Sequence, residues 1–124
     1  MISIIDDDEA VRAATENLVR SLGFRATTFA SAEQFLESPE FQETSCVITD
    51  VQMPGMTGVE LQSHLRERGL NVPMIFITAF PEDRIRRRVN DAGAIGFLSK
   101  PFEGCAMIEC LEQALRQNFV PTRH

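Results

Sequence analysis

The sequence contains no tryptophan and no tyrosine, and nine phenylalanines supply its large aromatic side chains. Flavin-binding proteins that stack Trp or Tyr on the cofactor are therefore disfavoured, all the more because no Ser/Thr-rich phosphate loop follows the first apolar run. No apolar run approaches the roughly 20 residues that cross a bilayer, so no membrane span is predicted. The apolar stretch 2–5 stops at acids and has no basic segment before it, so no signal peptide is predicted.

Cysteine, histidine and positive charge are also scarce. The three cysteines, Cys46, Cys105 and Cys110, are an odd number without CxxC spacing, which is typical of free thiols in a reducing cytosol and predicts a cytoplasmic protein. His64 and His124 have no neighbours typical of a metal or catalytic site. The net charge of −6 argues against direct contact of this domain with nucleic acid, because phosphate binding needs a basic surface.

The chain does contain a regular alternation of strand and helix patterns. Its 124 residues are enough for one domain with a core. Strands are predicted at 2–5, 25–29, 46–49, 74–78 and 95–98. Four of these are short continuous apolar runs, as in strands covered on both faces. Strands that alternate with helices form right-handed crossovers, so the predicted fold is α/β, a doubly wound (βα)5 unit with a five-stranded parallel sheet.

Helices are predicted between these strands from apolar residues at helical spacing. Ser31 with Gln34, and Thr57 with Glu60, have the spacing of capping boxes at two helix starts. The other predicted boundaries are a helix start at Pro81 and helix ends at Gly23, Pro39, Gly69 and Gly93. The domain is predicted to cover 1–118, and 119–124 to begin a C-terminal tail or linker.

Polar side chains lie at the ends of four predicted strands. Asp6 and Asp7 follow the first strand, Asp50 the third and Lys100 the fifth, and Thr78 ends the fourth. The carboxyl ends of parallel strands meet at one edge of the sheet, where doubly wound proteins bind ligands. These carboxylates, a hydroxyl and an ammonium are therefore expected to converge in one crevice. Each residue alone is common at such a position, and only their joint placement predicts a site.

Four stretches resemble the receiver domain of bacterial two-component response regulators: IIDDDEAVR, VITDVQMPGMTGVEL, IFITA and GAIGFLSKPF. They occur in the family's order and span essentially the whole chain. The stretches SAEQFL and TDVQMPGMTG resemble the FixJ-like subfamily, whose members usually carry a C-terminal LuxR-type helix-turn-helix. The resemblance implies a flavodoxin-like fold with strand order 2-1-3-4-5. It also implies a sensor histidine kinase as partner, and control of transcription through a DNA-binding domain beyond this chain.

The resemblance implies roles for single residues as well. Asp50 matches the phosphorylated aspartate, Thr78 the switch hydroxyl and Phe97 the switch aromatic. Lys100 matches the lysine that neutralises the phosphoryl group, and its bond to Pro101 is expected to be cis, which costs little at proline. Phosphorylation is expected to draw Thr78 inward and to open space for Phe97. The chain is thus expected to be a signalling switch and not an enzyme, apart from its own phosphoryl transfer and slow autodephosphorylation.

The same match implies a Mg²⁺ site. Two carboxylates about 4 Å apart repel by on the order of 4 kcal/mol at an effective dielectric constant of about 20, and a divalent cation with oxygen ligands removes that repulsion. Asp7, Asp50 and the backbone carbonyl of Gln52 are expected to bind the ion, and Asp6 to act through water. Gln52 and Phe80 lie where the family tunes the lifetime of the phosphoryl group.

A docking face is expected from the fourth helix, the fifth strand and the fifth helix. Arg84, Arg87 and Arg88 on the fourth predicted helix, with Glu109 and Glu112 on the fifth, give this face both charges, which favours a phosphorylation-dependent homodimer. A solvated helix face explains the arginines more simply.

Two other interpretations remain open at this point. Asp6 and Asp8 form the Asp-x-Asp pattern of haloacid-dehalogenase-like phosphatases, which also use Mg²⁺; there Asp6 would be the nucleophile and Asp8 the acid/base. That interpretation leaves Asp50 without a role, the chain is short for that fold, and an aspartate at position 8 is common as a helix N-cap. The other is a binding module of the same fold that never takes up phosphate, and the complete set of acids with Lys100 argues against it.

Overall fold

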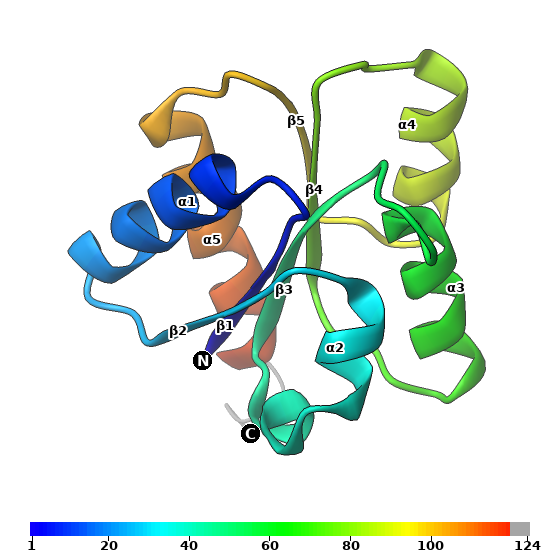
Figure 1. Cartoon of the computed structure of the whole chain (residues 1–124), viewed down its shortest axis with the longest axis horizontal. Helices are drawn as coiled ribbons and strands as arrows, with labels where there is room; N and C mark the ends of the chain where they lie inside the picture. The colour runs from blue at the N-terminus through cyan, green and yellow to red at the C-terminus, as the bar shows by residue number, and fades with distance from the viewer. Residues whose placement is uncertain (120–124) are drawn as a thin grey trace.

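The computed structural model describes residues 1–119, and these form a five-stranded parallel sheet covered by helices on both faces (Figure 1). The order across the sheet is β2-β1-β3-β4-β5. The strands are β1 (Ile2–Ile5), β2 (Ala26–Phe29), β3 (Cys46–Asp50), β4 (Met74–Thr78) and β5 (Gly96–Ser99). The predicted (βα)5 fold and strand order are confirmed, and each strand end differs from its prediction by at most one residue.

The helices divide between the two faces of the sheet. One face carries α1 (Glu9–Ser21) and α5 (Gly104–Phe119), and the other carries α2 (Ala32–Glu37), α3 (Gly58–Glu67) and α4 (Asp83–Asp91), as Figure 1 shows. Side chains alternate between the faces along a strand, so Ile2 and Ile4 pack on the α1/α5 side and Ile5 on the other. Because both faces are buried, the central strands need apolar residues at nearly every position, which explains their continuous apolar runs.

The core makes the strand ends rigid. Ile48 on β3 and Phe76 and Ile77 on β4 are fully buried just before the edge where the polar residues emerge. Burial of one such side chain contributes about 1.5–3 kcal/mol. Close packing of these residues therefore determines where the carboxyl ends of β3 and β4 lie relative to each other.

Side-chain caps hold the chain directly after β1 and before α3. Asp8 Oδ1 accepts the N–H groups of Ala10 at 2.9 Å and Val11 at 3.3 Å, so Asp8 is the N-cap of α1. Thr57 and Glu60 form the predicted reciprocal capping box of α3, with bonds of 2.9 and 3.1 Å. A cap of this kind contributes about 1 kcal/mol, and both lie in loops that lead from the site residues into a helix.

Two local features differ from the sequence pattern. Ser31 does cap α2 by accepting the Gln34 N–H at 3.1 Å, but the Gln34 side chain accepts the N–H of Ala30 and not that of Ser31. The predicted capping box is therefore only half formed there. A 3-10 helix at Pro39–Glu43 was not predicted, because so short a turn has no amphipathic period that a sequence pattern could display.

The start of α4 differs from its prediction. α4 begins at Asp83 and not at Pro81, with Glu82 at the N-cap position and no side-chain capping bond. α5 runs to Phe119, and the rest of the predicted tail, with His124, lies outside the described residues. Over residues 1–119, no helix has the length and apolar character that crossing a bilayer requires.

Candidate functional site

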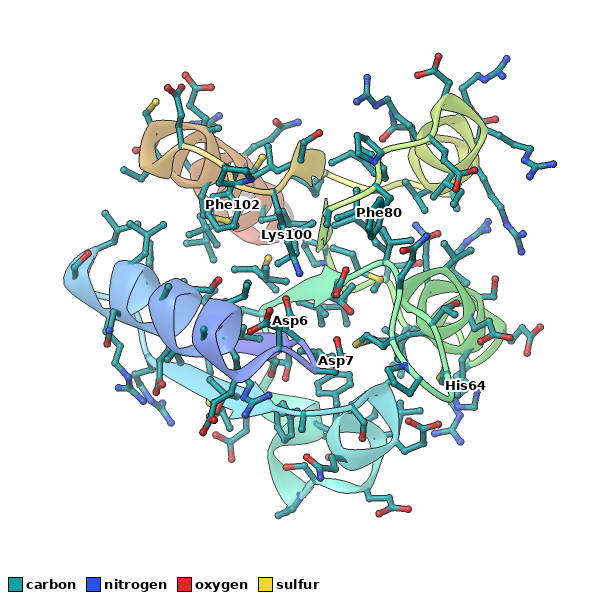
Figure 2. All side chains as sticks on the ribbon, turned by 45° about the horizontal axis from the view of Figure 1, so that its top comes forward. Asp6, Asp7, His64, Phe80, Lys100 and Phe102 are labelled. Carbon is teal, nitrogen blue, oxygen red and sulfur yellow. The ribbon has the colours of Figure 1, made fainter. Side chains whose placement is uncertain are left out.

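The predicted site residues gather at the carboxyl edge of the sheet. Asp50 is the last residue of β3 and Thr78 the last of β4. Asp50 is in register with Ile77, so Thr78 lies one residue further along the neighbouring strand. Figure 2 shows Lys100 reaching from the end of β5 toward Asp6, which follows β1. The topology thus brings together residues from four strands, as the sequence predicted.

Lys100 joins two buried aspartates. Its Nζ donates to Asp6 Oδ2 at 2.9 Å and to Asp50 Oδ2 at 3.2 Å. Asp6 is completely buried and Asp50 is 6% exposed, so water screens these charges weakly. Lys100 is the only lysine in the sequence, and its peptide bond to Pro101 is cis, as expected. The contacts make Lys100 the cation that holds the ends of β1 and β3 together.

Backbone groups and one arginine complete the surroundings of the two aspartates. Asp6 Oδ1 accepts the Asp8 N–H at 2.9 Å, and Asp50 Oδ1 accepts the Gln52 N–H at 3.3 Å. Arg12 Nη1 on α1 donates to the backbone carbonyl of Asp6 at 2.7 Å. Sequence reasoning did not assign Arg12, and its place in the IIDDDEAVR stretch was the available signal. The contact that the structure gives for Gln52 is its N–H, so the predicted role of its carbonyl stays a prediction.

The electrostatic balance of the site is unfavourable to a charged Asp50. Burial, and then the negative charge of Asp6, raise the pKa of Asp50 above its ordinary value of 3.8, although Lys100 opposes the shift. Burial alone would lower the pKa of Lys100, but its hydrogen bonds and charge attraction to Asp6 and Asp50 raise it above 10.5. Lys100 therefore stays protonated at neutral pH, and its single charge does not balance the neighbouring carboxylates.

The acids are close enough to share a cation. One carboxylate oxygen from each of Asp6, Asp7 and Asp50 lies within 4.8 Å of the other two. Asp7 is exposed, whereas Asp6 and Asp50 are buried, so the cluster opens to solvent on the side of Asp7. Three anionic oxygens without nitrogen or sulfur suit a hard divalent ion such as Mg²⁺. The donor set thus fits the predicted ion.

Thr78 and Phe97, the two predicted switch residues, occupy different surroundings. Thr78 is buried; its Oγ1 accepts the Phe80 N–H at 3.0 Å, and its carbonyl accepts the Lys100 N–H at 2.7 Å. Phe97 is half-buried on the α4 side of the sheet, where the guanidinium of Arg86 lies 5.2 Å from the ring centroid. The hydroxyl therefore lies at the site edge, while the aromatic ring packs beneath α4.

Gly58, the first residue of α3, allows that helix to approach the end of β3 closely. Its N–H donates to Val51 O at 2.9 Å, and a Cβ at this position would overlap the backbone carbonyl of Asp50. Sequence reasoning did not identify this constraint, because glycine after a Met-Pro-Gly-Met-Thr turn gives no sign of what lies opposite it. The α3 start is thus built directly against the backbone of Asp50.

The histidine and the thiols lie apart from this cluster. Figure 2 shows His64 on α3, away from Asp6; its buried Nε2 has no hydrogen-bond partner among the described residues. Cys46 is buried, which raises the pKa of its thiol to about 12 and makes it unreactive. Cys105 is exposed and Cys110 half-buried, and all three are free thiols.

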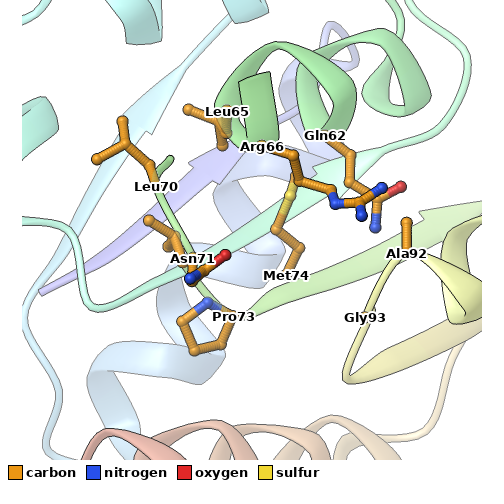
Figure 3. A pocket seen from close by; sticks show the side chains of 10 residues that line it. Gln62, Leu65, Arg66, Leu70, Asn71, Pro73, Met74, Ala92 and Gly93 are labelled. Atoms are coloured by element: carbon orange, nitrogen blue, oxygen red, sulfur yellow. The ribbon is translucent and has the colours of Figure 1, made fainter. Parts of the chain in front are cut away.

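A separate hollow of about 230 Å³ lies between α3 and the end of α4, near the start of β4 (Figure 3). Leu65 and Pro73 give it apolar walls, and Arg66 and Asn71 are polar groups on its lining. Its lining contains no carboxylate. The hollow is at the opposite end of β4 from Thr78, so it is not part of the acid cluster.

Comparison with known proteins identifies the class to which this fold and site belong. Residues 2–112 match the family described as the response regulator receiver domain. Response regulator protein TodT of Pseudomonas putida is 37% identical over 116 residues, which are 94% of this chain and 51% of that protein. Transcriptional regulatory protein FixJ of Azorhizobium caulinodans is 35% identical over 114 residues, 92% of this chain and 54% of that protein. A solved structure of response regulator StyR has a TM-score of 0.89 at 40% identity, covering 98% of this chain and 62% of that one.

The chain therefore belongs to the response regulator receiver domain family, and it spans about half the length of these curated relatives. Receiver domains of response regulators are signalling switches rather than enzymes, so family membership argues against the phosphatase interpretation. Asp8 has the N-cap role that its position suggested. The acid cluster of Asp6, Asp7 and Asp50, joined by Lys100, is the receiver site of this chain.

Proposed function

We propose that Asp50 accepts a phosphoryl group from a phosphohistidine of a sensor histidine kinase. The single observation that carries this proposal is the position of Asp50, at the end of a buried strand and bonded at 3.2 Å to the Lys100 ammonium. One Asp50 oxygen forms a bond to phosphorus as the bond from phosphorus to the donor imidazole breaks. The imidazole nitrogen keeps the electron pair and takes up a proton.

Mg²⁺ is the proposed cofactor, held by Asp7, Asp50 and the backbone carbonyl of Gln52, with Asp6 acting through water. When bound, the ion supplies positive charge to phosphoryl oxygens and cancels repulsion among the acids. The convergence of Asp6, Asp7 and Asp50 oxygens within 4.8 Å supports this assignment.

The chain's own residues stabilise the transferred group electrostatically. Lys100 Nζ, already aimed at Asp50, neutralises a phosphoryl oxygen as Asp50 is modified. The Thr78 hydroxyl turns toward another oxygen and gives up its contact with the Phe80 N–H. Phe97 then leaves the Arg86 guanidinium and moves toward the space behind Thr78. Two packings of the same core are thereby reweighted.

The phosphoryl group is expected to persist on Asp50 until slow autodephosphorylation or a phosphatase removes it. Gln52 and Phe80 are the proposed tuning residues. Both are exposed next to the site, and Phe80 is 67% exposed, so each side chain lies where it can shield or admit a hydrolytic water.

In the whole protein, this receiver would control transcription through a C-terminal DNA-binding domain in the cytoplasm. The names of its relatives and their roughly twofold greater length support this. A phosphorylation-dependent homodimer would use the face of α4, β5 and α5. Arg84, Arg87 and Arg88 are exposed on α4, and Glu109 and Glu112 are exposed on α5, so both charges are available to a second copy. Arg88 also lines a hollow with Glu60 and Glu67 of α3, so Arg84 and Arg87 are the stronger candidates.

Intact-mass analysis with acetyl phosphate and Mg²⁺ tests the proposal. Wild type should gain one phosphoryl group, Asp50→Asn none, and Asp6→Asn should still be labelled, at a lower rate. Omission of Mg²⁺ should prevent labelling of wild type. Label that survives in Asp50→Asn but disappears in Asp6→Asn would refute Asp50 as the acceptor, and no label on wild type would refute phosphoacceptor function.

A further inference from the structure

We infer that Glu33, on α2, is a positioning residue for the β3–α3 loop, residues 51–57. The inference rests on the proposed function, because this loop follows Asp50 and carries Gln52. Glu33 lies 23 positions from Met56 in sequence, and its Oε2 accepts the Met56 N–H at 3.0 Å. An exposed glutamate in the first turn of a helix would usually serve only the helix dipole. Here its carboxylate instead bonds to the backbone of another segment.

The loop has attachments at both ends, and Glu33 adds one at Met56, close to the α3 end. At the start, the Gln52 N–H binds Asp50 Oδ1. At the end, the Thr57 N–H binds Glu60. The intervening stretch turns at Gly55, which has a φ of +75°. Burial of Met53 in the core fixes the first part of this stretch, and the bond from Met56 to Glu33 fixes the backbone of its last part.

Gly55 and Glu33 fit each other closely. A Cβ on Gly55 would lie 2.7 Å from Glu33 Oε2, a separation that real Cβ atoms do not show. Glycine is required here for its positive φ, and a side chain at this position would also displace the Glu33 carboxylate from the turn. The Glu33 carboxylate therefore packs against the turn at Gly55 and accepts the N–H of the following residue, Met56.

Through this contact, α2 would help to position the loop groups that are proposed to bind Mg²⁺ and the phosphoryl oxygens. The Gln52 carbonyl and the loop N–H groups can stabilise charge at Asp50 only if the loop keeps one conformation, because electrostatic catalysis depends on preorganised dipoles. Glu33 acts through this loop and touches no reacting atom. Its loss should loosen the loop and weaken Mg²⁺ binding and phosphorylation together.

The test compares Glu33→Ala, Glu33→Gln and the control Glu37→Ala in the full 124-residue chain. Glu37 is exposed at the end of the same helix, so its removal changes charge and helix composition without touching the loop. Hydrogen–deuterium exchange of loop peptides is measured without phosphodonor. The Mg²⁺ dissociation constant is measured by calorimetry, and the labelling rate with acetyl phosphate and Mg²⁺.

Glu33→Ala should speed exchange around Met56 and reduce Mg²⁺ affinity and labelling rate by about 3- to 10-fold, the effect of one lost hydrogen bond. Glu33→Gln keeps an acceptor oxygen and should restore all three values to within about twofold, and Glu37→Ala should match wild type. The inference would be overturned if Glu33→Ala had the same exchange rate around Met56 and the same Mg²⁺ affinity as wild type. It would also be overturned if Glu33→Gln lost as much affinity and labelling rate as Glu33→Ala. Absence of labelling in wild type would refute the proposed function instead, because the exchange measurement does not depend on phosphorylation.

Discussion

Replacement of Asp50 by Asn should stabilise the domain in the absence of divalent cations. The Asp50 and Asp6 oxygens lie within 4.8 Å, which at an effective dielectric constant of about 20 gives a repulsion of about 3.5 kcal/mol. Lys100, at 3.2 Å, attracts Asp50 by about 5 kcal/mol on the same scale. Burial of the carboxylate costs several kcal/mol more, and the raised pKa of Asp50 indicates that burial and repulsion together exceed the attraction.

Asn at position 50 removes the repulsion and the burial cost while its carbonyl can still accept from Lys100. Lys100 also keeps its 2.9 Å bond to Asp6. The expected gain is on the order of 1–2 kcal/mol, which for a domain of this size raises Tm by about 3–8 °C. Because the chain has no Trp or Tyr, unfolding is best followed by far-ultraviolet circular dichroism or calorimetry.

The stability difference between Asp50→Asn and wild type should depend on pH, and the raised pKa of Asp50 sets the sign of that dependence. A carboxyl whose pKa is raised on folding contributes stability at low pH that is lost as pH rises through the folded pKa. The advantage of Asp50→Asn should therefore be small near 3.8, the ordinary pKa, grow as pH rises through the raised pKa of Asp50, and then become constant. Mg²⁺ at about a hundred times its Kd should reverse the order of stability, since it adds about 2.7 kcal/mol to wild type. A variant less stable than wild type at neutral pH without Mg²⁺ would show that crowding of charge does not dominate this site.

Three further substitutions or reagents probe other parts of the site. Gly58→Ala should reduce stability by more than about 1 kcal/mol and slow acetyl phosphate labelling, because its Cβ would overlap the acceptor residue's carbonyl; wild-type Tm and rate would contradict this. Arg86→Ala should cost about 0.5–1 kcal/mol, measured by denaturant unfolding, because it removes the cation over Phe97; an unchanged free energy of unfolding would contradict this. Lys100 should react slowly with amine-acylating reagents, because its raised pKa leaves little free amine, and faster in Asp6→Asn; equal rates by mass spectrometry would argue against the ion pair.

The parts of the structure that the sequence predicted are those governed by local pattern. Continuous apolar runs ended at Asp6 and Asp50 because both faces of the strands are buried and the side chains change character where the sheet ends. Thr57 with Glu60 was predictable because the capping box is a local geometry with a fixed spacing. The assignment of Asp50 as acceptor and Asp6 as neighbour came from the family resemblance, since residue spacing alone left Asp6 open as an alternative nucleophile.

The residues that escaped prediction act across long sequence separations. Glu33 meets Met56 from a helix 23 positions away, and Gly58 is constrained by a carbonyl that only the folded chain brings close. The helix of Glu33 was predicted correctly, but nothing in its own sequence says which loop its carboxylate faces. Contacts of this type depend on how helices, strands and loops pack together, whereas sequence patterns predict each helix or strand by itself.

A connection between the acids and Phe97 follows from the bonds of Lys100. Its side chain binds Asp50, and its backbone N–H binds the Thr78 carbonyl at 2.7 Å, so the ends of β3, β4 and β5 are tied through one residue. Phosphorylation would place roughly two negative charges next to Lys100 where Asp50 now carries one at most. The ammonium would then shift from Asp6, and the peptide that it shares with Thr78 would respond. Phe97 lies three residues earlier on β5 and is in register with Phe76 of β4, so a change at the strand end reaches the ring along a short covalent path. The proposed switch therefore needs no long pathway, because the cation at the site directly follows the strand that carries the aromatic ring.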